Sequence, residues 1–146
     1  MPKAESHYPP NVRHPATVVK KFVEGFHTHN VDLLMSLYAA DATNYQVADQ
    51  PVKGRDEIRK GFEAFFRAFP DSTTIANNII EDGEWAALEW RGTGTHLGEF
   101  AGNPATGKKF ELKGCGFFHV KNGLIVYQRG YWDKATWFGQ LGIKIS

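Results

Sequence analysis

Few of the side chains that could move a proton lie in an apolar part of this sequence, and those that do are widely spaced. His96 closes a Gly-Thr-His triplet, and Gln128 lies in the last apolar segment of the chain. A histidine or carboxylate held in an apolar cavity can act as a general acid or base. The Gln128 amide can only donate and accept hydrogen bonds, so its chemistry would be orientation of a ligand. His96 and Gln128 are the candidate catalytic residues, with Asp49 as an alternative acid.

Other reactive side chains have structural explanations. His96 itself could instead bond the backbone of its loop. His27 and His29 are two residues apart on a predicted helix and do not share a face, so no metal site is expected, nor another cofactor. Asp133 directly precedes a predicted helix and is interpreted as its N-cap. Cys115 is the only cysteine, which excludes an internal disulfide and favours a reducing compartment, with the cytoplasm as the expected location.

The elements that must position these side chains fall into two groups. Apolar residues at helical spacing predict three helices in the first half of the chain, and alternating segments separated by turn signals predict a run of strands and one closing helix. Helices followed by strands indicate an α+β domain. The predicted helices cover about residues 15–30, 33–38 and 55–69, the strands 73–81, 84–96, 108–120 and 124–132, and the closing helix 134–141.

The faces of the last strands follow from alternation of side chains. If residues 121–123 form a three-residue loop, Gly114 lies opposite Gly130 and Gly116 lies opposite Gln128. One face is then apolar and rich in glycine, and the other is charged. The inward set comprises Leu88, Trp90, Gly92, Gly94, His96, Leu112, Gly114, Gly116, Phe118, Gln128, Gly130 and Trp132, and the outward set includes Glu89, Arg91, Lys109, Glu111 and Lys113.

The overall composition limits the class of partner. The 146 residues fit one domain, taken as 15–146, after a polar, proline-bearing segment, 1–14, interpreted as a mobile tail. Hydrophobic residues make up 42% and aromatic residues 14%, enough to build a core and line a cavity. Lys and Arg number 17 against 16 Asp and Glu, without charged runs, so neither nucleic acid nor a membrane is expected as a partner. The expected partner is a small, largely apolar molecule.

Several segments, taken in order, resemble one family. They are residues 94–108 (GTHLGEFAGNPATGK), 117–126 (FFHVKNGLIV), Asp133, residues 140–142 (QLG) and residues 38–42 (YAADA). Together they resemble the SnoaL-like polyketide cyclases of the nuclear transport factor 2-like superfamily, over about residues 15–142. The resemblance implies a cone, in which a strongly curved antiparallel sheet wraps around three N-terminal helices and encloses a pocket, often in a homodimer.

The catalytic pattern of the family is missing. The positions that hold the acid/base aspartate, a histidine and a glutamine in the cyclases are Gly130, Gly116 and Gly114 here. The three positions that steroid isomerases of the superfamily use are Phe22, Gln46 and Gly116. The nearest counterpart of the epoxide hydrolase triad, Glu89, Arg91 and Asp133, has a different order and spacing.

Two functions from different classes remain open. One is acid/base chemistry of the cyclase or isomerase type on a polyketide, terpenoid or steroid-like molecule, and the other is binding of such a molecule without chemistry. In both, the glycines are expected to leave a bare backbone floor with aromatic rings around it. The outward Phe117, Tyr127 and Tyr131 predict a homodimer. The predicted ligand-binding residues are Trp90, Gly114, Gly116, Phe118, Gly130, Trp132, Phe22, Phe62 and Phe66.

Overall fold

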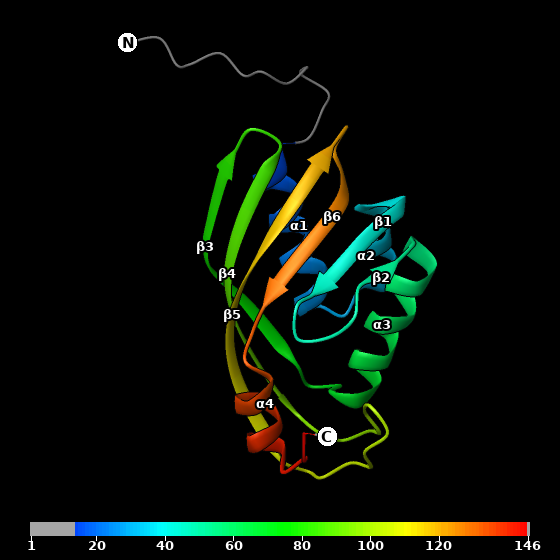
Figure 1. Ribbon diagram of the computed structural model, residues 1–146, viewed down its shortest axis with the longest axis vertical. Helices are drawn as coiled ribbons and strands as arrows, with labels where there is room; N and C mark the ends of the chain where they lie inside the picture. The colour runs from blue at the N-terminus through cyan, green and yellow to red at the C-terminus, as the bar shows by residue number, and fades with distance from the viewer. Residues whose placement is uncertain (1–13, 146) are drawn as a thin grey trace.

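The computed structural model describes residues 14–145, so the predicted tail, 1–14, lies outside the described residues except for His14. A six-stranded curved sheet packs against helices on its concave side, with α1 behind the sheet and α3 along its edge in Figure 1. The elements are α1 (Pro15–His27), α2 (Val31–Ser36), β1 (Tyr38–Gln46), β2 (Val52–Lys53), α3 (Arg55–Ala68), β3 (Thr73–Asp82), β4 (Trp85–Thr95), β5 (Lys109–Lys121), β6 (Leu124–Tyr131) and α4 (Lys134–Leu141).

The order of the strands is β2-β1-β6-β5-β4-β3. The α+β class and the conical sheet are as predicted, but the sheet is not antiparallel throughout, because β1 pairs with β6 in parallel. The sequence had predicted a helix to Tyr38 and a polar stretch after it. Instead, α2 ends at Ser36 and residues 38–46 form a strand. This strand escaped prediction because its inward side chains, such as Asn44 and Gln46, are polar rather than apolar.

The aromatic face of α3 forms the helical side of the core. Phe62 and Phe66 are buried, and their rings meet those of Phe22 and Phe26 on α1 at centroid distances of 5.1–6.3 Å. Such tilted and edge-to-face pairs are the arrangements that aromatic rings prefer. The aromatic rings of α1 and α3 therefore form a wall that faces the concave side of the sheet.

The β5–β6 hairpin gives the predicted faces of the sheet, but its turn differs from the predicted one. Its turn has two residues, Asn122 and Gly123, with φ of 52° and 75°, the backbone that a type I′ turn requires. A bulge follows between His119 and Val120, which adds one residue on β6 and restores the predicted phase. Gly116 therefore lies opposite Gly130, a shift of two residues that leaves every predicted face unchanged.

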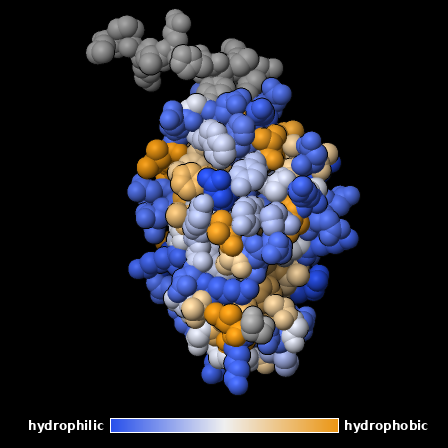
Figure 2. All heavy atoms as spheres, in the orientation of Figure 1, coloured by the Kyte–Doolittle hydropathy of each residue, from blue (hydrophilic) through white to orange (hydrophobic). Residues whose placement is uncertain are grey.

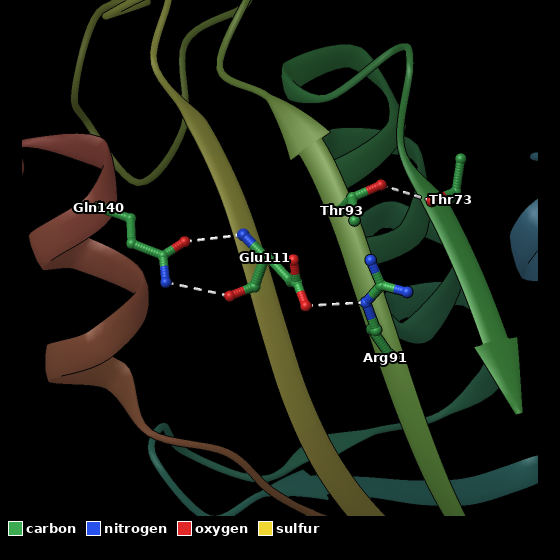
Figure 3. Close-up of polar contacts among 5 residues, drawn as sticks. All are labelled: Thr73, Arg91, Thr93, Glu111 and Gln140. Carbon is green, nitrogen blue, oxygen red and sulfur yellow. Dashed lines mark hydrogen bonds and ion pairs between the residues drawn. The ribbon is translucent and has the colours of Figure 1, made fainter. Parts of the chain in front are cut away.

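The outward face carries the predicted charged residues. The Nε of Arg91 on β4 donates to the carboxylate of Glu111 on β5 at 2.8 Å, and both side chains are exposed (Figure 3). Among residues 14–145, no strand lies beside Glu111 on the other edge of β5, because the pairing of β5 with β6 begins only at Cys115. The side chain of Gln140 on α4 replaces that strand, with bonds of 2.7 and 3.0 Å to the Glu111 backbone.

Candidate functional site

A cavity of about 410 Å³ lies between the concave face of the sheet and helices α1 and α3. Its wall is mostly apolar, as expected for a site that encloses a small organic molecule. Among the predicted ligand-binding residues, those that line it are Phe22, Phe62, Trp90, Gly116, Phe118, Gly130 and Trp132, and the predicted catalytic residue Gln128 lines it as well. Gly114, Phe66 and His96 are not among its lining residues.

The three glycines of the sheet differ in what covers them. A Cβ atom at Gly114 would lie 2.8 Å from Cε2 of the Trp90 indole, which packs over it. A Cβ atom at Gly130 would meet the amide of Gln46, with Cδ at 2.7 Å and Nε2 at 2.8 Å. Only at Gly116 are the nearest atoms all backbone, with the Arg129 carbonyl oxygen at 3.0 Å. The expected bare floor is therefore found at Gly116, whereas side chains cover Gly114 and Gly130.

Gln128 is the buried polar group of the cavity, with only 6% of its surface exposed. Its Oε1 accepts a hydrogen bond from the hydroxyl of Tyr38, which is fully buried at the start of β1. Burial raises the pKa of the Tyr38 hydroxyl well above its usual value of 10.0, because the phenolate would lose its hydration. Tyr38 therefore remains a neutral donor at physiological pH.

A second group of polar side chains lies beside Gln128. Oε1 of Gln46 accepts a hydrogen bond of 2.9 Å from the indole Nε1 of Trp132. Nε2 of Gln46 donates to Oδ1 of Asn44 at 2.7 Å. Asn44 and Gln128 are paired in register on the parallel strands β1 and β6, and both line the cavity. The polar part of the wall thus includes three carboxamides, those of Asn44, Gln46 and Gln128.

His96 does not reach this cavity. It is fully buried, and its Nδ1 lies 3.0 Å from the Thr106 hydroxyl and accepts from the Thr106 backbone N–H at 3.3 Å. An Nδ1 that accepts a hydrogen bond leaves the ring proton on Nε2, which is buried without a partner among the described residues. The structural alternative, a bond to the loop backbone, is the arrangement observed.

The ionisable side chains that line the cavity are Asp49 and Glu57, and both are exposed. The carboxylate of Asp49 forms an ion pair of 2.7 Å with Nζ of Lys134 at the start of α4. Of the two acidic residues in 41–49, Asp41 and Asp49, Asp49 is the one that lines the cavity. No cluster of His, Cys, Asp and Glu among residues 14–145 has a metal-binding arrangement.

Asp133 caps α4, as its position before the helix predicted. Its carboxylate accepts hydrogen bonds from the backbone N–H of Thr136, at 3.1 Å, and from the Thr136 hydroxyl. These bonds, led by that from the Thr136 hydroxyl, lower the pKa of Asp133 below its usual 3.8, because they stabilise the carboxylate.

Sequence comparisons place the chain in a family. Residues 16–141 match the family model for SnoaL-like polyketide cyclase, and the chain belongs to that family. No curated protein matches it.

Solved structures share the fold. IdmH from Streptomyces antibioticus, a candidate polyketide cyclase, is 27% identical, with a TM-score of 0.75 over 90% of this chain and 100% of IdmH. A SnoaL-like protein from Jannaschia Sp. CCS1 is 16% identical, with a TM-score of 0.83 over 97% and 100% of the two chains. An epoxide hydrolase from M. tuberculosis, described as LEH-like, is 17% identical, with a TM-score of 0.73 over 90% and 92%.

Sequence reasoning missed two residues of the site, the lining residue Asn44 and the buried Tyr38 that bonds Gln128. It found Gln46 only as the counterpart of the steroid isomerase base. Tyr38 was assigned to the apolar face of a helix. The available signal was the run Thr43-Asn44-Tyr45-Gln46, in which residues that favour strands alternate with carboxamides. Alternation of this kind predicts a strand with a polar inner face, which occurs where a sheet lines a binding site.

Proposed function

We propose that this protein binds a small, largely apolar molecule of the polyketide, terpenoid or steroid-like kind in the conical cavity. The observation that carries the proposal is a cavity of about 410 Å³ with aromatic walls and a few carboxamides. Its size is within the range of small-molecule sites, about 300–1,000 Å³. The ionisable groups at its lining are exposed, so binding without chemistry is the function that the geometry supports best.

A pair of glycine variants tests this proposal. Gly61 on α3 lines the cavity, whereas Gly139 on α4 does not, and an added Cβ would meet no atom within 4 Å at either position. Leucine at either position should leave the fold intact and favour the helix by about 0.5–1 kcal/mol, because glycine is a poor helix former. Gly61→Leu should lose most of its affinity for the neutral probe N-phenyl-1-naphthylamine, and Gly139→Leu should keep it. Equal affinities in the two variants would contradict the proposal.

Acid/base chemistry of the cyclase or isomerase kind is the second candidate, and Asp49 is the observation in its favour. A carboxylate at the cavity could take a proton from the carbon next to a bound ketone and leave the enolate oxygen to the amide donors. The test is exchange of the methyl protons of 2-acetylnaphthalene in D₂O, followed by NMR. Catalysed exchange that is lost in Asp49→Asn supports this function. Exchange no faster than in buffer would contradict it and leave ligand binding without chemistry as the function.

A homodimer through the outer face of the sheet is also proposed. Phe117 is 37% exposed and Tyr131 is 42% exposed, and the guanidinium carbon of Arg129 lies 5.6 and 5.9 Å from their ring centroids. On the side of the molecule shown in Figure 2, orange and pale residues occur among hydrophilic ones. An arginine stacked on aromatic rings is typical of protein interfaces.

We also propose the cytoplasm as the location of the protein. Among residues 14–145 no helix could span a bilayer. Cys115 is exposed and unpaired, which suits a reducing compartment.

A further inference from the structure

The direction of two carboxamides in the cavity wall determines which ligand group they can bind. The Tyr38 hydroxyl is fully buried, and Gln128 is its only hydrogen-bond partner among residues 14–145. If the Gln128 amide were turned round, its Nε2 would donate to Tyr38, and the tyrosine proton would be buried without an acceptor. Such a group costs more than a hydrogen bond contributes. Tyr38 therefore donates to Oε1, and Nε2 of Gln128 has no partner within the described part of the chain.

The same reasoning determines the orientation of the Asn44 carboxamide. An indole N–H can only donate, so Trp132 requires Oε1 of Gln46 as its acceptor, at 2.9 Å. Nε2 of Gln46 must then donate, and its acceptor is Oδ1 of Asn44 at 2.7 Å. The Nδ2 group of Asn44 is left without a hydrogen-bond partner in residues 14–145. Two separate chains of hydrogen bonds thus each end in a free N–H donor.

The two free donors belong to neighbouring strands. Asn44 and Gln128 are partners in the parallel ladder of β1 and β6, and both line the cavity. Neighbouring strands lie about 4.8 Å apart, so two side chains on the same face can reach one ligand group. We infer that Asn44 and Gln128 form a two-donor subsite for a carbonyl oxygen of the ligand, with Tyr38, Gln46 and Trp132 as positioning residues.

Charge decides between a neutral carbonyl and a carboxylate. Bringing an anion into an apolar cavity is costly unless a cation pairs with it. The lining of the cavity includes two acidic residues, Asp49 and Glu57, and no lysine or arginine. Lys134, at the start of α4, is paired with the lining residue Asp49. A neutral ketone or quinone-type oxygen is therefore the ligand group that this subsite fits, a conclusion that rests on the proposed binding function and makes it specific.

Two isosteric probes measure this preference. 2-Acetylnaphthalene carries a carbonyl oxygen where 2-isopropenylnaphthalene carries a CH₂ group, so the ratio of their affinities isolates that oxygen from shape and apolar area. The ratio is obtained from displacement of N-phenyl-1-naphthylamine. Gln128→Leu and Asn44→Leu should each lower the ratio in favour of the ketone by roughly 2- to 10-fold, the effect of one neutral hydrogen bond. Asn78→Leu, at an exposed position on β3 outside the cavity, is the matched control and should leave it unchanged.

The positioning role of Tyr38 needs its own measurement. In Tyr38→Phe the Gln128 amide is free to rotate, so the affinity ratio should fall and the ¹³C=O stretching band of bound 2-acetylnaphthalene should move to higher frequency. A purely structural defect would weaken both probes equally and leave the band in place. The double variant Tyr38→Phe/Gln128→Leu removes both partners, so no unpaired group remains, and it should match Gln128→Leu in ratio.

The possible outcomes separate this inference from the proposed function. If both probes bind and neither Gln128→Leu nor Asn44→Leu changes the ratio, the two-donor subsite is refuted while the apolar binding function stands. If neither probe binds the native protein, the binding function is refuted and the subsite with it. A lower ratio in both variants, with the carbonyl band moved in each, supports the subsite.

Discussion

Substituting Gly130 by alanine tests how the cavity wall is built. The new methyl group would occupy the position of the Gln46 amide, whose Cδ would be 2.7 Å away, so the flexible end of Gln46 must move. Moving it breaks the bonds to Trp132 and Asn44. Two neutral hydrogen bonds at about 0.5–1.5 kcal/mol each predict a loss of about 1–3 kcal/mol in the free energy of unfolding. For a domain of this size each kcal/mol lowers the melting temperature by about 3–4 °C.

A double-mutant cycle in urea distinguishes this mechanism from simple backbone strain. Gln46→Ala should cost about as much as Gly130→Ala, because both lose the same two bonds. Once Gln46 is an alanine, adding Gly130→Ala should cost almost nothing, since the obstructing amide is absent. The double variant is therefore expected to be about as stable as either single variant. If the two losses simply add, Gln46 is not what excludes a side chain at Gly130, and the reasoning fails.

Three further substitutions have definite expected outcomes. Asp133→Ala should lower the melting temperature at neutral pH without changing probe affinity. Because the pKa of Asp133 is lowered on folding, its contribution is full above the unfolded value near 3.8 and disappears as the pH falls through the folded value, so native and variant midpoints should converge in acid. His96→Ala should lower the free energy of unfolding by about 2–5 kcal/mol, because it leaves a void, and should keep probe affinity. Weaker probe binding in this variant would indicate that His96 belongs to the ligand site. Phe117→Glu should convert a dimer to a monomer in sedimentation velocity, and a native monomer at high concentration would refute the proposed interface.

The strand faces could be predicted from sequence because they depend only on alternation and on one turn. Leu88, Gly116 and Phe118 all face inward as expected. The loop length was wrong, yet the bulge in β6 compensated for it, so the predicted faces are correct and the predicted partner of Gly130 is not. A bulge depends on local backbone geometry, and the residue types around Val126 do not predict one.

The site itself was harder to predict than the fold. Its lining brings Asn44 on β1 together with Gln128 and Trp132 near the end of the chain, and Tyr38 bonds Gln128 without lining the cavity. No local pattern links such distant segments. The rule that apolar residues face inward also fails where a sheet lines a binding site. The same rule placed His96 correctly on the inner face but could not show that Thr106 occupies its Nδ1.

The parallel pairing of β1 with β6 has a consequence for the order in which the chain folds. Tyr38 and Gln128, which this pairing brings together, are 90 residues apart in sequence. Contacts of such separation form slowly, because a long loop must close before they are gained. During synthesis, α1, α2, α3 and β1 emerge long before β6, so the complete sheet is not yet present to cover their aromatic residues. β6 completes the sheet and also carries Gln128. The ligand site is therefore complete only when the domain is complete. A chain truncated before residue 124 would lack both β6 and Gln128.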